Sequence, residues 1–322
     1  MICLGIESTA HTFGVGIVKD KEILSNEKSV YYPKKGSGII PRDAAQHHSE
    51  NAFDILKNAL EKAKLKMDDI DIIAFSQGPG LPQCLRIGAV AARVLALKYN
   101  KPLVGVNHCV AHIEVGKICT SSKDPVVLYL SGGNTQVIAF AGGRYRVFGE
   151  TQDVPIGNAL DMIARSMMLP MPGGLYIEKL AKEGKYVELS YVVKGMDLSF
   201  SGLATESIKR YKQGAKKEDI AYSFEETCFA MLTEVTERAM AHTDKEEVLL
   251  VGGVAANKRL QKMIKTMCDE RGAKFFVVPN EYSGDNGSMI AVTGILHNKP
   301  ILTEQSSIMQ KWRVDEVDIE FK

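Results

Sequence analysis

Residues 126–140 read VVLYLSGGNTQVIAF, two apolar runs that flank a turn of small polar residues. Residues 2–18 read ICLGIESTAHTFGVGIV and have the same order of apolar run, small-residue turn and apolar run. Apolar runs of this length on either side of a small-residue turn are typical of a β-hairpin. Two such hairpins about 125 residues apart predict a repeat at the scale of a domain. The sequence therefore indicates two similarly built halves that face each other.

Around both hairpins, short apolar strands alternate with longer helical segments, which is the pattern of an α/β protein. In chain order we expect a helix over 43–64, a strand over 70–75, helices over 85–98 and 220–242, a strand over 248–251, a helix over 258–271, a strand over 275–278 and a helix over 286–297. The polar stretch 120–125, closed by Pro125, is the predicted linker. The expected halves are residues 1–121 and 122–322, with the last helix as a candidate to pack back on the first half.

The composition is that of an ordinary globular chain, with 322 residues, 45% of them apolar and 25% charged. Forty basic and 39 acidic residues leave a formal charge of +1, which excludes a strong attraction of the whole protein to nucleic acid or to an anionic membrane. The six cysteines form no CxxC pair, the N-terminus reaches an acid at Glu7 without a basic region, and no apolar run has the length of a membrane helix. We therefore expect a cytoplasmic protein that does not enter a membrane.

Four loops of small residues are candidates for a nucleotide site. They are Glu7–Thr9 with Thr12 and Gly14, Ser131–Thr135, Gly252–Asn257 and Ser283–Ser288. Glycine lets backbone N–H groups approach an anion, and hydroxyl groups add donors. Any one of these loops alone could be only a tight turn, but two lie at matching places in the repeat. None fits the GxxxxGK[ST] or GxGxxG pattern, so the predicted site is of another type and lies between the halves.

A second motif is the pair His108 and His112, whose spacing places two imidazoles side by side on a helix face. Such a pair can bind a metal, but it also arises by chance. A zincin-type peptidase requires HExxH, and Cys109 occupies the position of the catalytic glutamate. Asp285 is the candidate third ligand, with a helix N-cap or turn aspartate as the alternative. The adjacent His47 and His48 point to different helix faces, so we expect them at the surface or the edge of the core.

Several motifs, taken together and in this order, resemble one family. They are GIESTAHT from Gly5, SQGPG from Ser76, NHCVAH from Asn107, LYLSGGNTQ from Leu128, GNALD from Gly157, PGGLYIEKLA from Pro172, VKGMDLSFSG from Val193, VGGVAAN from Val251 and GDNG from Gly284. The chain is similar to the tRNA adenosine threonylcarbamoyltransferases, formerly labelled O-sialoglycoprotein endopeptidases, and most closely to their archaeal and eukaryotic KEOPS branch. The resemblance covers nearly the whole chain.

This resemblance implies the fold of the actin, Hsp70 and sugar-kinase group (ASKHA), with two RNase H-like halves and a nucleotide in the cleft between them. It implies one metal ion, with iron favoured over zinc because of a phenolate neighbour. The metal ligands implied are His108, His112, Tyr129 and Asp285. The nucleotide and substrate contacts implied are Tyr129, Leu130, Ser131, Gly132, Gly133, Asp161, Gly174, Glu178 and Asn257.

The reaction implied is transfer of threonylcarbamoyl from threonylcarbamoyl-AMP to N6 of the adenosine 3′ of the anticodon, in tRNAs that read codons beginning with A. AMP is released. The partners implied are tRNA and KEOPS-type subunits, including a small atypical protein kinase and a small dimerising subunit. The alternatives are an ATPase or small-molecule kinase of the ASKHA fold and a non-catalytic nucleotide-binding scaffold. The net charge of +1 predicts that the chain alone binds tRNA weakly.

Overall fold

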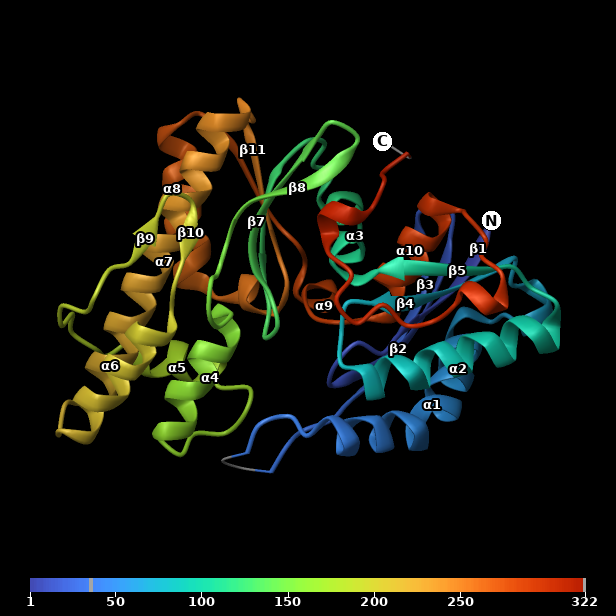
Figure 1. Ribbon diagram of the computed structural model, residues 1–322, viewed down its shortest axis with the longest axis horizontal. Helices are drawn as coiled ribbons and strands as arrows, with labels where there is room; N and C mark the ends of the chain where they lie inside the picture. Colours follow the sequence, from blue (N-terminus) through green and yellow to red (C-terminus); the bar gives the residue numbers. More distant parts are fainter. Residues whose placement is uncertain (35–36, 321–322) are drawn as a thin grey trace.

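The molecule is described by a computed structural model that covers residues 1–34 and 37–320. Its described strands form a five-stranded mixed sheet in each of two lobes (Figure 1). The first sheet has the order β3-β2-β1-β4-β5 and consists of β1 (Ile2–Glu7), β2 (Thr12–Lys19), β3 (Glu22–Val30), β4 (Ile72–Gly78) and β5 (Leu103–Asn107). The second has the order β12-β11-β6-β7-β8 and consists of β6 (Val126–Leu130), β7 (Thr135–Ala141), β8 (Arg144–Glu150), β11 (Glu247–Val251) and β12 (Lys274–Val277).

The two sheets share one topology. In the first, β1 pairs antiparallel with β2, and β2 with β3, while β4 and β5 lie parallel to β1. In the second, β6 pairs antiparallel with β7, and β7 with β8, while β11 and β12 lie parallel to β6. The internal repeat predicted from the two hairpins is therefore confirmed. β3 and β5 were not predicted from the sequence.

Among the described residues the helices are α1 (Pro41–Ala63), α2 (Pro82–Tyr99), α3 (His108–Thr120), α4 (Ile156–Ser166), α5 (Gly174–Ala181), α6 (Ser201–Lys212), α7 (Lys217–Thr243), α8 (Lys258–Glu270), α9 (Asn280–Ser283) and α10 (Gly287–His297). Of these, α1, α2, α7, α8 and α10 match the predicted ranges to within a few residues at each end, and the others had no predicted range. Short additional elements are the hairpin of β9 (Val193–Lys194) with β10 (Asp197–Leu198) and the 3₁₀ turns Met67–Asp69, Gly253–Ala256, Thr303–Gln305 and Val314–Glu316. Among the described residues, no helix has both the length and the hydrophobicity to cross a membrane.

Side chains alternate across β1, so the strand contacts a different helical layer on each face. Leu4 and Ile6 belong to the core formed with α1 and α2. Cys3 belongs to a separate core formed with α3 and α10. In the second lobe, Leu128 of β6 packs in the large core of α4 to α8 on one face of the sheet.

Helix α3 lies between the two lobes (Figure 1). Ala111 and Val115 pack in the core of the first lobe, whereas Val110 and Ile113 pack against the second sheet. Nine consecutive residues, 108–116, are buried. Both sheets enclose this helix, including its buried polar residues His108, His112 and Glu114. Both histidines of the candidate metal pair are on this helix, at the junction of the lobes.

Helix α10 packs on the first sheet, although it follows the second sheet in the chain. Glycines allow this close approach, because a Cβ on Gly16 would lie 2.1 Å from the backbone nitrogen of Ser288. A Cβ on Gly5 would lie 2.3 Å from the nitrogen of Ala291, and one on Gly287 would lie 2.1 Å from the nitrogen of Gly16. The division at 121/122 therefore separates the two sheets. Helix α10 follows this division in the chain but packs on the first sheet.

The segment after α10 returns from the first lobe to the second. Ile301 bridges to Leu103 at the edge of the first sheet, and the Met309 N–H donates to the Gln77 carbonyl at 2.7 Å. Farther along, the Ile319 N–H donates to the carbonyl of Gly143, in the turn between β7 and β8, at 3.0 Å. This segment therefore connects the two lobes beside α3, in addition to the linker at 121–125.

Candidate metal and nucleotide site

The N-terminus of α3 places His108 and His112 one turn apart. Asn107 caps the helix, since its Oδ1 accepts the N–H of Cys109 at 3.0 Å and that of Val110 at 3.2 Å. Asn107 also donates from Nδ2 to the Trp312 carbonyl at 3.2 Å, which fixes it to the C-terminal segment. The two imidazole centroids are 4.7 Å apart with their planes at 87°. The HxxxH spacing thus brings two nitrogen donors to one side of a buried helix.

Asp285 joins the two histidines from the loop before α10. Its Oδ1 lies 3.3 Å from Nε2 of His112 and 3.6 Å from Nε2 of His108. The three donor atoms lie within 4.8 Å of one another. Donors about 2.05 Å from a tetrahedral metal ion are about 3.3 Å apart, so the two distances from Asp285 to the imidazoles suit a shared ion. Asp285 is not a helix cap, because Asn286 caps α10 by accepting the Met289 N–H.

Glu7, at the end of β1, contacts His108 at Nδ1, the ring nitrogen on the opposite side from the one that faces Asp285. Its Oε2 lies 3.0 Å from Nδ1 of His108, while its Oε1 accepts the Thr9 N–H at 2.6 Å. A proton on Nδ1 that is shared with Glu7 leaves the Nε2 lone pair of His108 free to face Asp285 and a metal ion. Glu7 is completely buried, so its carboxylate has lost its hydration. The hydrogen bonds with Thr9 and His108 offset the free-energy cost of that loss.

The charges of this cluster are strongly coupled in the metal-free protein. Burial lowers the pKa of His108, but the charge and hydrogen bond of Glu7 outweigh it and raise that pKa to about 9. Burial also lowers the pKa of His112, so this imidazole is neutral. Burial raises the pKa of Asp285, but the His112 hydrogen bond and the His108 charge hold it well below its usual range. A metal ion entering at neutral pH would therefore displace the proton of His108.

We predict that Glu7→Ala lowers the affinity for Zn²⁺ about 10- to 100-fold. Glu7 attracts a divalent ion more strongly than the single proton that competes for His108, so its loss weakens metal binding despite easier deprotonation. Competition with a chromogenic zinc chelator measures the change, with Glu22→Ala as control because Glu22 is exposed. In the unsubstituted chain the zinc affinity should rise from pH 7 until the pH passes about 9, where His108 has lost its proton. An unchanged affinity in Glu7→Ala would contradict this role.

Tyr129 lies against the histidine pair from the second sheet. Its ring centroid is 5.1 Å from that of His112, and the side chain is fully buried. Its hydroxyl accepts a hydrogen bond from Nδ2 of Asn134 at 3.4 Å. Burial raises the pKa of the Tyr129 phenol well above its usual value, and Cys109 and Asp285 add to the rise. Metal-free Tyr129 is therefore a neutral phenol beside the three ligand atoms, and the adjacent Leu130 is buried in the core of the second lobe.

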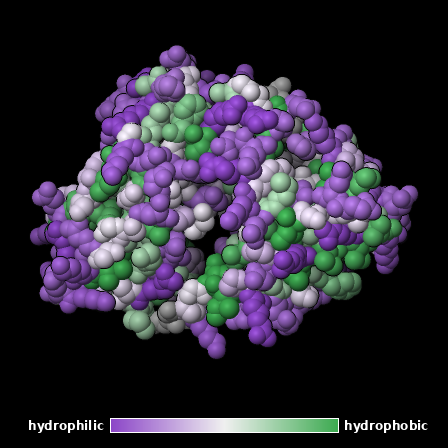
Figure 2. Space-filling model, viewed as in Figure 1, coloured by the Kyte–Doolittle hydropathy of each residue, from purple (hydrophilic) through white to green (hydrophobic). Residues whose placement is uncertain are grey.

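The loop Ser131–Thr135 presents open backbone next to a helix N-terminus. Oγ of Ser131 accepts the N–H groups of Gly133 and Asn134, at 3.2 and 3.0 Å. A Cβ on Gly132 or Gly133 would meet no atom within 4 Å, so a ligand can approach both. α4 follows closely, because a Cβ on Gly157 would lie 2.6 Å from the Ser131 carbonyl oxygen. Figure 2 shows the molecule hollowed between the two lobes.

The other predicted nucleotide contacts lie on the second lobe and have partners in the protein. Asp161 accepts the Gly173 N–H at 2.7 Å, next to Gly174 at the start of α5. Glu178 accepts the Lys258 N–H at 2.9 Å. Asn257 caps α8 through Oδ1. Each of these side chains therefore has a defined position on the second lobe.

His11 interacts electrostatically with a carboxylate of the candidate metal site and with one of the candidate nucleotide site. Burial raises the pKa of Asp161, and the Gly173 N–H, Arg165 and His11 oppose the rise. The same imidazole also lowers the pKa of Asp285. His11, in the first hairpin, thus lies near carboxylates of both parts of the site. His47 and His48 lie outside the ligand set, as expected. His47 is half-buried and contacts Ser29, but the expectation of a surface or core-edge position was wrong for His48, which is fully buried and contacts the Ala10 carbonyl.

Two buried glutamates of the site were not singled out from the sequence. Glu7 was quoted only as part of a small-residue loop, although a carboxylate that ends an apolar strand is itself a signal. Glu225 lies on the apolar stripe of α7, between Ala221 and Cys228, and accepts a hydrogen bond from Asn257. A charged residue on the buried face of a helix requires a partner, and that rule could have identified it.

Comparison with known proteins gives one family over most of the chain. The family model described as TsaD, tRNA N6-adenosine threonylcarbamoyltransferase, matches residues 22–292. A protein of Thermococcus sibiricus with the name tRNA N6-adenosine threonylcarbamoyltransferase is 58% identical over 324 residues, covering 99% of each chain. One of the same name from Thermococcus kodakarensis is 57% identical, again over 99% of each chain.

Solved structures resemble the chain in fold. HypF of T. kodakarensis superposes with a TM-score of 0.66 at 16% identity, over 91% of this chain and 47% of that protein. The activator of the 2-hydroxyisocaproyl-CoA dehydratase from Clostridium difficile, solved with bound ADPNP, gives 0.55 at 12% identity over 91% and 94%. Together with the repeated sheet topology, these matches confirm the predicted α/β fold of the actin, Hsp70 and sugar-kinase type.

Proposed function

Because the chain belongs to the tRNA N6-adenosine threonylcarbamoyltransferase family, we propose that it transfers threonylcarbamoyl from threonylcarbamoyl-AMP to N6 of the adenosine 3′ of the anticodon. The tRNAs are those that read codons beginning with A, and AMP is the second product. The observation that carries the proposal is the convergence of His108, His112 and Asp285 at the junction of the lobes. Near it, the second lobe presents the open backbone of Gly132 and Gly133.

One metal ion is proposed at His108, His112 and Asp285, with Tyr129 as the neighbouring phenolate. Two imidazoles and a carboxylate on one face suit zinc or non-haem iron, and an anionic phenolate favours iron. When bound, the ion would act as a Lewis acid and hold the acyl group in line for attack. The chain itself contributes the orientation of His108 through Glu7 and the exclusion of water, since all three ligands are at least largely buried.

The second lobe is proposed to bind the AMP part of the substrate. The backbone of Ser131 to Gly133 would donate to the phosphate and stabilise the charge that grows on it as AMP leaves. Asp161 and Glu178 would accept from ribose hydroxyls, because a carboxylate that accepts one backbone N–H still has free lone pairs. Tyr129, Leu130, Gly174 and Asn257 complete the proposed contacts.

The target adenosine lies in the single-stranded anticodon loop, so it can enter the cleft without opening a duplex. A route between the lobes is compatible with the hollow in Figure 2. The chain supplies few long-range charges to attract this loop, which makes additional RNA-binding subunits necessary for efficient capture.

We further propose that the protein is the catalytic subunit of a cytoplasmic KEOPS-like assembly, with a small atypical protein kinase and a small dimerising subunit. An exposed apolar stripe supports a protein partner: Val90, Val94 and Leu97 lie at helical spacing on α2 and are exposed, and Phe53 is exposed on the neighbouring helix α1. Figure 2 shows hydrophobic residues gathered over this part of the first lobe. Monomers rarely leave such a stripe uncovered.

The direct test is to incubate the protein, with and without its partner subunits, with synthetic threonylcarbamoyl-AMP and unmodified tRNA. We expect threonylcarbamoyladenosine in the tRNA, detected by mass spectrometry, together with an equal amount of AMP. Absence of the modified adenosine under iron and zinc alike, with all partners present, would contradict the proposal. ATP turnover without tRNA would instead favour the ATPase or small-molecule kinase.

A separate prediction concerns tRNA binding by the isolated chain. The formal charge of +1 leaves few net phosphate contacts, so we expect a dissociation constant no tighter than the micromolar range of non-specific binding at physiological salt. Filter binding measures it, and the same assay on the assembled complex should give a much tighter value. Tight binding by the chain alone would contradict this prediction.

A further inference from the structure

Asn257 lies where three helices of the second lobe meet. It ends the loop after β11 and begins α8, and its side chain is 7% exposed. Glu178 of α5 reaches the same point, where it accepts the Lys258 N–H. Glu225 of α7 reaches it from the interior of the lobe and is 2% exposed. The junction therefore contains two of the proposed nucleotide contacts and one buried carboxylate with no assigned role.

The hydrogen bonds of the Asn257 side chain leave one of its two Nδ2 hydrogens without an acceptor among the described residues. Oδ1 accepts the Arg259 N–H at 2.9 Å and the Leu260 N–H at 3.1 Å, which fully uses its two lone pairs. Nδ2 donates to Oε1 of Glu225 at 2.7 Å. An amide Nδ2 carries two hydrogens, and no other acceptor for it is found in the described part of the chain. The orientation of the amide is thus set from both ends, and one N–H is left to donate.

Burying the carboxyl group of Glu225 at this position costs free energy of desolvation. It lies among the apolar residues of the second-lobe core, such as Phe224 and Cys228. Burial raises the pKa of its carboxyl to about 8, and Glu178 and Glu226 add to the rise while Asn257 opposes it. An apolar side chain of the same size would pack there without this cost. Stability alone therefore does not account for a buried carboxyl group that accepts a hydrogen bond from Asn257.

We propose that Glu225 is a positioning residue for the nucleotide: it holds the Asn257 amide so that the second Nδ2 hydrogen is presented to an acceptor atom of the AMP part of the substrate. This inference rests on the proposed function, because it takes Asn257 as a nucleotide contact. Glu225 itself touches no ligand. The nucleotide class recognised is an adenosine monophosphate, and the acceptor is an oxygen or an unprotonated ring nitrogen.

The test compares Glu225→Leu with Glu225→Gln, using AMP as the probe in titration calorimetry. Leucine keeps the packing but removes the acceptor, so we expect AMP to bind about 10-fold more weakly, with a melting temperature equal to or above that of the parent chain. Glutamine retains an acceptor oxygen, so its affinity should stay within about 3-fold of the parent. In turnover with the partner subunits, Glu225→Leu should raise KM for threonylcarbamoyl-AMP and leave kcat nearly unchanged, since the contact is remote from the reacting bond.

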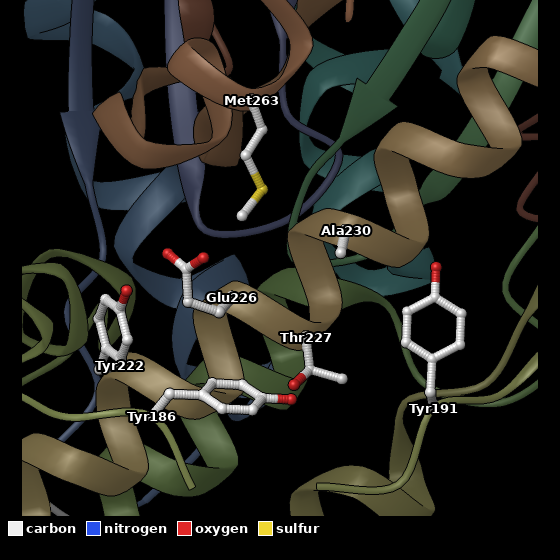
Figure 3. A pocket seen from close by; sticks show the side chains of 7 residues that line it. All are labelled: Tyr186, Tyr191, Tyr222, Glu226, Thr227, Ala230 and Met263. Carbon is white, nitrogen blue, oxygen red and sulfur yellow. The ribbon is translucent and has the colours of Figure 1, made fainter. Parts of the chain in front are cut away.

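Glu226→Leu is the matched control. Glu226 follows Glu225 on α7, but it pairs with Arg259 and points into an outer groove of about 300 Å³ with Tyr186, Tyr222 and Met263 (Figure 3). The Glu226→Leu variant should bind AMP with the same affinity as the parent chain. Equal AMP affinity in Glu225→Leu, or an equal loss in Glu225→Leu and Glu226→Leu, would overturn the proposal.

A double-mutant cycle covers the case in which Glu225→Leu folds poorly. We expect Glu225→Ala to weaken AMP binding about 10-fold in the parent chain, because it also removes the acceptor, and Glu225→Gln to keep the affinity within about 3-fold. Neither substitution should change the affinity further in an Asn257→Ala background. Additive losses would overturn the inference. If the parent chain bound no AMP at millimolar concentration, the nucleotide site of the proposed function would fail instead, which is a different result from an unaffected Glu225 variant.

Discussion

Replacing His112 by alanine is expected to lower the rate of threonylcarbamoyl transfer by at least about 10³-fold and to remove the bound metal. His112 is 1% exposed, and its Nε2 lies 3.3 Å from the Asp285 carboxylate. Its loss leaves only His108 and Asp285 of the three converging donors and opens a space that water can enter. Among the described residues, His108, His112 and Asp285 are the only group of three or more His, Cys, Asp or Glu side chains close enough to hold a metal ion.

The measurement combines element analysis of protein purified without added metal with the tRNA modification assay. We expect one equivalent of iron in the parent chain and none in His112→Ala. Zinc in the parent chain would show that the proposed metal is wrong. His47→Ala is the matched control, because His47 is half-buried on Ser29 outside the cluster and should keep metal and activity. Activity within about 10-fold of the parent after loss of His112 would contradict a metal-dependent reaction.

Gly16→Ala is expected to destabilise the protein by about 3 kcal/mol and to weaken metal binding in the molecules that remain folded. The added Cβ would lie 2.1 Å from the Ser288 nitrogen and 2.4 Å from its Cα. These are backbone atoms, so the only relief is to move α10 away from β2. Asp285 lies directly before Asn286, the N-cap of that helix, and would move with it.

Thermal unfolding and zinc titration of Gly16→Ala, well below its melting temperature, test the two parts separately. The control is Gly202→Ala in α6, where a Cβ would meet nothing within 4 Å and alanine favours the helix slightly. A melting temperature and zinc affinity equal to those of the parent would show that α10 does not depend on this contact. Loss of stability without loss of zinc affinity would separate the helix position from the position of Asp285.

The sequence by itself determined the fold class and the repeat. Apolar runs and turn residues around 2–18 and 126–140 follow from local backbone geometry, so both hairpins could be predicted. Helical periodicity predicted α1, α2, α7, α8 and α10 but not the other helices. The motif order identified the family. β3 was not predicted, because Glu22–Val30 carries an irregular mixture of polar and apolar residues at the edge of its sheet.

Only the tertiary structure decided which side chains meet. His108 and Asp285 are separated by most of the second lobe in sequence, and they come together because glycines let α10 pack on the first sheet. Glu7 and Glu225 gained their roles from partners about 100 and 30 residues away. Periodicity reports the face on which a residue lies but not the distance to a residue on another element. That distance depends on how closely two backbones can approach, which is set by packing in three dimensions.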